Sequence, residues 1–279
     1  MRLYTVPSGK HTYQGRETKK GNKMKLLTVS LLVLLPLGIG AHAQSDSAAV
    51  KINLGTADNF ALLGGSGITN VSAQTYIIGA VGSSPTPAIT GLTQSQVKGH
   101  LYLKSSPVTA QAQKDLTVAY NQAAGAPCGT DLTGKDLGGM RLGPGVYCFS
   151  SSAGLTGTLT LDAHGNPDSQ WVFQIGSTLT TATNSIVKMV LGHKAPPWEK
   201  GLRGCNVYWQ VGSSATIGTS STFVGKILAL TSITLDGGTF RGKGLARNGA
   251  ITMSAQETVD GPPCDTTGIP DGMGMVSQK

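Results

Sequence analysis

Three threonines near the C-terminus recur at a fixed interval, and their chemistry indicates an ordered surface rather than a reaction. Thr216, Thr234 and Thr252 lie 18 residues apart, each between apolar residues in a short β-prone run. A fixed period near twenty residues is typical of a solenoid in which each turn of the chain, here called a coil, is one repeat. Because strands of successive coils stack about 4.8 Å apart, equivalent threonines would form a ladder. A flat array of hydroxyls and methyls is unsuited to catalysis but suited to ordering water.

Carboxylates, which a solenoid hydrolase or lyase would need in pairs, are sparse and scattered. Asp162 and Asp168 flank a turn at residues 164–167, and Asp236 and Glu257 fall in separate coils. Cleavage of a glycosidic bond requires two carboxyl groups on either side of the substrate, or a base placed in a groove. The chain also lacks a phosphate-binding loop, a His-Glu-x-x-His motif and a serine-hydrolase elbow. We therefore assign no catalytic residue and expect neither enzyme activity nor a cofactor.

Four cysteines, all located after residue 43, indicate disulfides in an exported protein. Three pairings of Cys128, Cys148, Cys205 and Cys264 are possible. We favour Cys128–Cys148, which would close a local loop, and Cys205–Cys264, which would tie down the last coil. The chain has no Cys-x-x-Cys motif and its histidines after residue 43 are scattered, so we expect no metal site.

Short strands and a single helix are the elements that would carry these residues. Apolar runs alternate with Gly-rich turns over residues 53–104 and again from residue 132 onward. Residues 107–124 differ, because Ser106 can cap a helix, Pro107 suits its first position and Gly125 follows its end. The apolar residues that share one face of this helix at the expected spacing are Val108, Ala112, Leu116, Ala119, Tyr120 and Ala123. The pattern predicts a mainly β fold with one long helix packed along a sheet.

The N-terminal region has the features of an export signal. Met24 and Lys25 precede an apolar run at 26–39, and Ala41-His42-Ala43 resembles a cleavage site. We expect residues 1–23 to be a non-native upstream extension, 24–43 a signal peptide, 44–264 one domain and 265–279 a flexible tail. The net charge is +8, but residues 1–43 hold seven Lys/Arg and one Glu, which leaves fifteen against thirteen and a charge of about +2. This balance gives nucleic-acid binding no electrostatic basis.

Several segments in the correct order resemble the microbial ice-binding protein family. The opening run at 53–63 begins Asn53-Leu54-Gly55-Thr56, and further similar segments lie at 67–70, 88–91, 142–147, 171–176, 207–212, 225–229 and 245–250. The resemblance covers roughly residues 53–260 and includes the helix in its expected place. It implies a discontinuous right-handed parallel β-helix with a helix packed alongside, and a secreted protein whose partner is the surface of an ice crystal.

The resemblance also implies an ice-binding motif of Thr, Ala or Gly, any residue, then Thr or Asn, repeated on several coils. Residues 181–184 fit this motif, while 219–222, 236–239 and 254–257 depart from it at one or two positions. Asp236 and Glu257 would add charge to the surface, so we expect moderate activity. The candidate ice-contacting residues are Thr181, Thr183, Asn184, Thr219, Ser221, Thr222, Asp236, Gly238, Thr239, Ser254 and Gln256.

A carbohydrate-binding or adhesive solenoid is the alternative function, because flat polar β faces also bind glycans. Exposed aromatic side chains would favour it, and Trp198 and Tyr76 are the only loose candidates in the sequence. We expect a monomer that binds no nucleic acid and has no membrane span in the mature chain, since the apolar run at 26–39 is short and lies in the signal segment.

Overall fold

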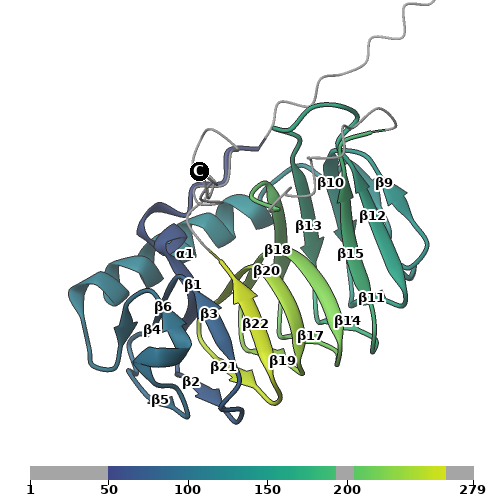
Figure 1. The fold of residues 1–279 in the computed structure, drawn as a ribbon. Helices are drawn as coiled ribbons and strands as arrows, with labels where there is room; N and C mark the ends of the chain where they lie inside the picture. The colour runs from purple at the N-terminus through teal and green to yellow at the C-terminus, as the bar shows by residue number, and fades with distance from the viewer. Residues whose placement is uncertain (1–49, 193–203, 262–279) are drawn as a thin grey trace, which may run out of the picture. The chain divides into compact units, whose positions relative to one another are not determined.

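The computed structural model of the chain describes residues 50–192 and 204–261. The expected upstream extension, the signal segment, Cys264 and the expected tail lie outside these residues, and so does Trp198. The described part is a parallel β-solenoid with one α-helix along one side (Figure 1). This architecture agrees with the fold expected from the sequence.

One sheet of the solenoid has seven short strands, all paired in parallel. Its strands follow the order β11 (Ala153–Leu155), β14 (Leu179–Thr181), β17 (Ala215–Ile217), β19 (Ile233–Leu235), β21 (Ala250–Met253), β2 (Gly67–Asn70) and β5 (Ile89–Thr90).

The second sheet has fifteen strands and covers two sides of the solenoid. It does so because two long strands, β18 (Ser221–Ala229) and β20 (Gly238–Ala246), pair with one set of short strands at their start and with another set at their end. The first set is β9 (Arg141–Leu142), β12 (Thr158–Asp162), β15 (Ile186–Val190), β22 (Glu257–Asp260), β3 (Tyr76–Ile78) and β6 (Val97–Lys98). The second set is β8 (Thr130–Asp131), β10 (Gly145–Phe149), β13 (Trp171–Ile175), β16 (Val207–Val211), β1 (Phe60–Gly64), β4 (Ala80–Ser83) and β7 (Leu101–Tyr102).

The coils do not stack in chain order. The last described coil pairs with the first, since Ile251 of β21 lies beside Ile68 of β2 and Thr258 of β22 lies beside Tyr76 of β3. The purple-blue β1 and β2 therefore adjoin the yellow-green β20 and β21 in Figure 1. This closure is the discontinuity that the resemblance implied, and it makes the stacking of the whole solenoid depend on contacts between the two ends of the chain.

Helix α1 spans Pro107–Ala124, the range expected from the sequence. The Ser106 side chain accepts a hydrogen bond from Val108 N at 3.2 Å, which satisfies one of the free N–H groups at the helix start. The buried side of the helix is formed by Thr109, Ala112, Leu116, Ala119, Tyr120 and Ala123. The expectation that Val108 belongs to this side is wrong, because its side chain is 44% exposed and Thr109 takes its place. Two 3-10 helices, η1 (Gly55–Asn59) and η2 (Gln94–Gln96), complete the elements.

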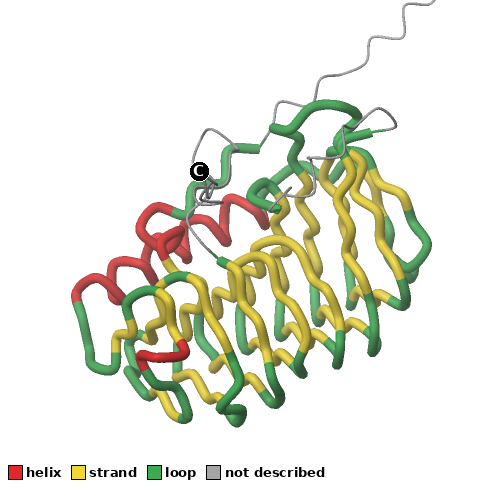
Figure 2. The backbone as a smooth tube through the Cα atoms, in the orientation of Figure 1, coloured by secondary structure: helices red, strands yellow, loops and turns green. Residues whose placement is uncertain are grey.

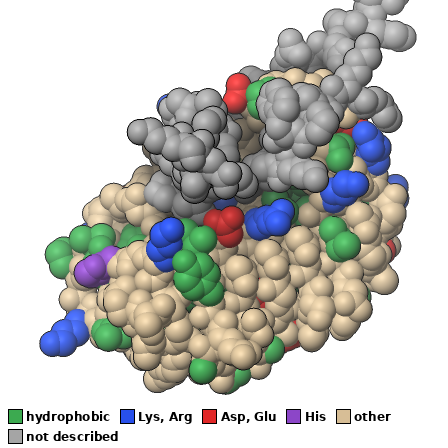
Figure 3. Space-filling view, viewed as in Figure 1, with side chains coloured by type: hydrophobic (Ala, Val, Ile, Leu, Met, Phe, Trp, Pro, Cys, Tyr) green, Lys and Arg blue, Asp and Glu red, His purple; other side chains and the backbone are tan. Residues whose placement is uncertain are grey.

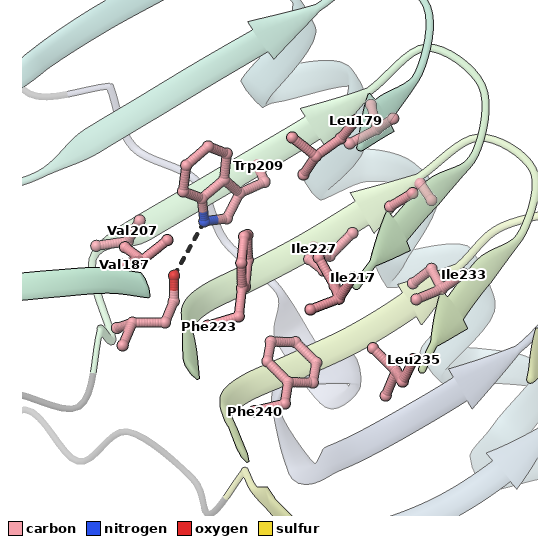
Figure 4. Packing of buried hydrophobic residues seen from close by; sticks show 14 of the residues in the cluster. Leu179, Val187, Val207, Trp209, Ile217, Phe223, Ile227, Ile233, Leu235 and Phe240 are labelled. Carbon is pink, nitrogen blue, oxygen red and sulfur yellow. Dashed lines mark hydrogen bonds between the residues drawn. The ribbon is translucent and has the colours of Figure 1, made fainter. Parts of the chain in front are cut away.

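Apolar side chains fill the inside of the solenoid (Figure 4). Rings from successive coils stack on one another, with Phe173 and Trp209 centroids 3.9 Å apart and nearly parallel, and with Phe223 and Phe240 continuing the series. The Trp209 indole donates a hydrogen bond to Val224 O at 3.0 Å, so its one polar atom is satisfied inside the core. A second apolar cluster lies between α1 and the sheet and includes Leu116, Tyr208 and Leu245.

The disulfide expected between Cys128 and Cys148 is present, and it joins the segment after α1 to strand β10. Cys205 is also disulfide-bonded. Its expected partner, Cys264, lies outside the described residues, so that pairing stays a prediction.

Candidate functional site

A ladder of threonines runs up the seven-stranded sheet, which we call the threonine sheet. Thr180 pairs with Thr216, Thr216 with Thr234 and Thr234 with Thr252 in direct register. The ladder then crosses the chain discontinuity, because Thr252 pairs with Thr69 and Thr69 with Thr90. The result is six threonines on six adjacent strands, with Gly154 of β11 in the seventh position.

The alternation of side chains in each strand explains why these threonines point outward. In β17 and β19 the residues on either side of the threonine are Ala215, Ile217, Ile233 and Leu235, and all four are buried in the core. Successive side chains of a strand face opposite sides, so the central threonine must face solvent. The short apolar-Thr-apolar run seen in the sequence is thus the pattern of one rung of this sheet.

A second column of small residues lies two positions before the ladder. It contains hydroxyl side chains directly before four of the strands and Ala or Gly at or directly before the start of the others, namely Ser152, Thr178, Ser214, Ser232, Ala250, Gly67 and Ala88. Neighbouring members contact one another, since Thr178 Oγ1 donates to Ser152 Oγ at 2.8 Å and Ser232 N donates to Ser214 Oγ at 3.3 Å.

The two columns form a regular and uncharged grid. Outward positions along one strand lie about 6.6 Å apart and equivalent positions on adjacent strands about 4.8 Å apart. None of the seven strands contains an Asp, Glu, Lys, Arg or His. Hydroxyls can therefore hold water at fixed points while the methyl groups between them offer water no competing partner.

The candidate residues named from the sequence lie beside this grid, at the corner where the threonine sheet turns into the first set of strands. The turns of successive coils are stacked there, along the lower edge of the solenoid in Figure 2. Five of the candidates have exposed side chains in these turns: Thr183, Asn184, Thr219, Ser254 and Gln256.

Two candidates are excluded from surface contact by their burial. Thr181 is 3% exposed and its hydroxyl accepts a hydrogen bond from Gly218 N at 2.9 Å. Ser221 is 2% exposed and its hydroxyl donates to Ala182 O at 3.2 Å. The sequence interpretation was wrong for both side chains, because they satisfy backbone groups inside the corner instead of meeting an external surface.

The remaining candidates lie at the margin of the grid or beyond it. Thr222 and Thr239 are in register with each other, but on the neighbouring side of the solenoid. Gly238 has a φ of 141° and lies against the backbone of Ser221, which leaves no room for a side chain. Asp236 is half-buried, and Ser254 Oγ lies 2.5 Å from one of its carboxylate oxygens.

The corner carries less charge than the sequence indicated. Glu257 was expected to bring a charge to the surface, but its side chain is buried. Burial raises its pKa from 4.5 to about 7, a hydrogen bond from the Gly237 backbone acts in the opposite direction, and the nearby Asp236 raises the pKa further. Asp236 is therefore the carboxylate that reaches the grid at the corner, and the exposed Asp136, which forms a β-bridge with Gly154, borders the grid at the end of the ladder.

Half of the ladder was missed from the sequence. The 18-residue spacing identified Thr216, Thr234 and Thr252, but Thr180 is separated from Thr216 by a coil twice that length. Thr69 and Thr90 belong to the first coils of the chain and join the ladder only through the discontinuous stacking. The signal that was available is the Gly-Ile-Thr of 67–69 and the Ala-Ile-Thr of 88–90, which match Ala250-Ile251-Thr252.

The described residues give little basis for a metal site or a membrane-spanning helix. Within residues 50–192 and 204–261, no three His, Cys, Asp or Glu side chains are grouped closely enough to hold a metal ion. Over the same residues, the structure contains no helix with the length and apolar character that crossing a membrane requires.

Fold and site together define a parallel β-solenoid that presents one uncharged, hydroxyl-rich sheet. A model of the ice-binding-like family matches residues 62–259, and the chain belongs to this family.

Known relatives and solved structures agree with this membership. An ice-binding protein from Nostoc sp. (strain HG1) is 47% identical over 228 residues, covering 81% of this chain and 80% of the relative. An ice-binding protein from Colwellia sp. is 32% identical, covering 85% of this chain and 95% of the relative. The crystal structure of an ice-binding protein from an Antarctic biological consortium superposes with a TM-score of 0.66 at 40% identity, covering 74% of this chain and 89% of that one. An Arctic yeast ice-binding protein superposes with the same TM-score at 30% identity, covering 78% of this chain and 97% of that one.

Proposed function

We propose that this chain is an ice-binding protein that adsorbs to ice through the threonine sheet and so inhibits ice growth and recrystallisation. The observation that carries the proposal is the ladder of six threonines in unbroken register on an uncharged sheet. Membership of the ice-binding-like family and the names of the similar proteins support it.

Adsorption to ice needs a surface that holds water in positions compatible with a crystal. The threonine hydroxyls lie on strands whose spacing is fixed by backbone hydrogen bonds, and the residues that flank them are locked in the core. Such a surface loses little conformational entropy when it docks, because its side chains are already ordered. The exposed turn residues Thr183, Thr219 and Ser254 would extend the contact surface beyond the edge of the sheet.

We also propose that the protein is secreted and that it has no catalytic activity. The signal-like segment at 24–43 and the disulfide between Cys128 and Cys148 support a secreted protein. The activity we propose needs no cofactor, no reacting group and no second subunit, so we infer a monomer that is not an enzyme and whose partner is the ice surface.

A substitution in the centre of the ladder tests the proposed surface. Strand β19 is the middle strand of the seven, and Thr234 is its outward residue. We expect Thr234→Tyr to abolish ice shaping and most of the thermal hysteresis, because a bulky ring lifts the flat sheet away from the crystal. The measurement is nanolitre osmometry with crystal images, together with the melting temperature of each variant.

A matched control lies on the neighbouring side. Thr239→Tyr makes the same chemical change on β20, outside the grid, and should keep full hysteresis. Thr219→Tyr in the corner turn should reduce activity if the turns contribute to the contact. A folded Thr234→Tyr variant with unchanged hysteresis would show that the threonine sheet is not the ice-contacting surface. Round, freely growing crystals with the folded parent protein would refute ice binding itself.

A further inference from the structure

Cations on the strands are confined to one side of the solenoid. The described strands contain six Lys or Arg residues, and two of them, Lys226 and Lys243, are buried. The other four have exposed side chains: Lys98, Arg141 and Lys188 lie on the first set of strands, and Arg241 lies in the first half of β20. We call the outer side of this set, with the first halves of β18 and β20, the cationic face. Figure 3 views this side and shows blue groups following one another across it, with one red group among them.

Strand register places the four cations in a single column. Arg141 pairs with Thr160, and Thr160 with Lys188. Strands β15 and β18 share one pair, Ile186 with Thr222, and two residues further along β18 the buried Val224 pairs with Arg241. The column ends with Asp260, Ile78 and Lys98 in register. Arg141 and Lys188 therefore lie two strands apart in register, which corresponds to about 10 Å since adjacent strands lie about 4.8 Å apart, and Arg241 lies on the second strand beyond Lys188.

Three of these four cations form no ion pair within the described part of the protein. Arg141 forms an ion pair with the buried Asp162, with two nitrogens at 2.9 and 2.6 Å from one oxygen. Lys98, Lys188 and Arg241 take part in no ion pair within the described residues. Asp260 is the one acidic side chain in the column, and it stands beside Arg241 in register without an ion pair between them. Three available cations thus face one carboxylate.

A second column on the same side supplies groups of other kinds. This second column lies two residues before the first along each strand. Its hydroxyls come from Thr158, Thr222, Thr239 and Thr258, and it also includes two exposed apolar side chains. These are Ile186 and Tyr76, which are 40% and 42% exposed. Tyr76 stands in register with Thr258 at one end of the hydroxyl column.

We propose that the cationic face binds an extended acidic polysaccharide, with carboxylates of its sugar residues on Lys188 and Arg241. Charge-assisted hydrogen bonds from Lys and Arg select carboxylates. The threonine hydroxyls match the hydroxyls of the sugars, and the ring of Tyr76 offers the amphipathic surface on which a pyranose packs. Cations, hydroxyls and an aromatic ring, which are the three kinds of group that an acidic polysaccharide requires, therefore occur side by side on this face.

The spacing of the cations favours this occupant. The length of one pyranose residue in an extended polysaccharide is about equal to the distance between two adjacent strands of the sheet. In a two-fold chain, alternate residues turn the same edge toward a surface, so their carboxylates recur at about two strand spacings, which is the separation of the strands that carry Arg141, Lys188 and Arg241. A nucleic acid presents phosphates more densely and requires a concentrated basic patch, whereas this column interposes Thr160 and Val224 between its cations.

This binding is independent of ice adsorption, because the cationic face and the threonine sheet are different sides that share only a corner. A protein held by polysaccharide on one side would keep its threonine sheet available. The chain would then be retained in an anionic extracellular matrix while the other side contacts ice.

The test compares binding of the full chain to immobilised alginate, a polyuronate, and to dextran, a neutral polysaccharide. We expect binding to alginate that weakens with salt and no binding to dextran. The double variant Lys188→Gln/Arg241→Gln should lose affinity on the order of tenfold or more, because two charge-assisted contacts are removed. The control Lys104→Gln/Lys114→Gln makes the same change of charge at exposed positions near α1 and should bind like the parent.

Further outcomes separate this proposal from its alternatives. Tyr76→Ala should weaken alginate binding at every salt concentration, because it removes packing and not charge. Equal losses in both double variants, or none in either, would overturn the proposal. Tighter binding to duplex DNA or to phosphatidylserine vesicles than to alginate would also overturn it. Thermal hysteresis of Lys188→Gln/Arg241→Gln should equal that of the parent, which establishes that the variant is folded and distinguishes a failure here from a failure of ice binding.

Discussion

The burial of individual acidic side chains determines how much negative charge lies near the threonine sheet. Asp236 and Glu257 are one coil apart in the sequence, but only Asp236 reaches the margin of the sheet while Glu257 is buried. The sequence placed both residues in the repeated motif of the expected ice-contacting surface but could not tell which side chain points inward. The same limit applies to Thr181 and Ser221, since a turn has no period from which facing can be predicted.

Glu257 should make the stability of the protein depend on pH. Its pKa of about 7 in the folded state exceeds the 4.5 of an exposed glutamate, so the folded state binds the proton more tightly. The stabilisation is therefore complete below about pH 4.5 and is lost as pH rises through 7. We expect the free energy of unfolding to fall by roughly 2–3 kcal/mol between pH 5 and 8, since each unit of pKa shift corresponds to about 1.4 kcal/mol.

Denaturant titrations at several pH values measure this effect, and Glu257→Gln is the matched control. Glutamine stays neutral, so the variant should lose this pH dependence and exceed the parent in stability at pH 8. Parallel pH profiles for the two proteins would show that Glu257 titrates like an exposed carboxylate.

Among the elements, the sequence predicted the helix and most strands well because their patterns are local. Ser106, Pro107 and Gly125 mark the ends of α1, and the apolar runs expected from residue 132 onward include β13 and β16. The faces of the elements were harder to predict. Val108 fits the apolar side of α1 by spacing, but the neighbouring Thr109 is the residue that packs against Gly82 of the adjoining strand.

The stack of rings inside the strands should contribute much of the stability of the central coils. Trp209 is fully buried between Phe173 and Phe223 and donates to Val224 O. We expect Trp209→Ala to lower the free energy of unfolding by about 3–5 kcal/mol through the cavity it leaves. Trp209→Phe keeps a ring but leaves the Val224 carbonyl without its partner, and should cost about 1–3 kcal/mol.

Chemical denaturation of the two variants beside Tyr76→Ala checks the ring stack. Tyr76 is also aromatic but is exposed on β3, so its removal should change stability by about 0.5 kcal/mol or less. Similar losses for Tyr76→Ala and Trp209→Ala would mean that the internal stack has no special role.

For the whole molecule, the sequence predicted the solenoid but not the order in which its coils stack. The repeat at 216, 234 and 252 fixes three consecutive rungs, whereas the pairing of Thr252 with Thr69 joins residues 183 positions apart. No local pattern encodes such a pairing. It depends on the N-terminal segment folding back over the later coils, where η1 lies between α1 and strands β18 and β20.

One carboxylate links that N-terminal segment to the later coils. Asp58 of η1 accepts a hydrogen bond from Lys226 Nζ at 3.0 Å, and Lys243 Nζ lies 3.7 Å from the same oxygen and donates to the Asp58 carbonyl. Both lysines are buried, and burial lowers the pKa of Lys243 to about 8 although Asp58 acts to raise it. Asp58 therefore compensates positive charge at the position where the chain closes on itself.

We expect Asp58→Ala to lower the free energy of unfolding by about 3–5 kcal/mol at pH 7, because it leaves two buried ammonium groups without this carboxylate. The deficit should shrink as pH rises toward about 8, because without Asp58 the pKa of Lys243 falls further and this buried amine then loses its proton at a lower pH than in the parent. Asp115→Ala is the control. Asp115 holds the same segment through Thr56, at 2.8 and 2.6 Å, but it is solvent-accessible and faces no buried cation. Its loss should cost about 1 kcal/mol across neutral and alkaline pH, where this carboxylate is ionised. Equal and pH-independent losses in the two variants would mean that the closure depends on apolar packing of η1 and not on Asp58.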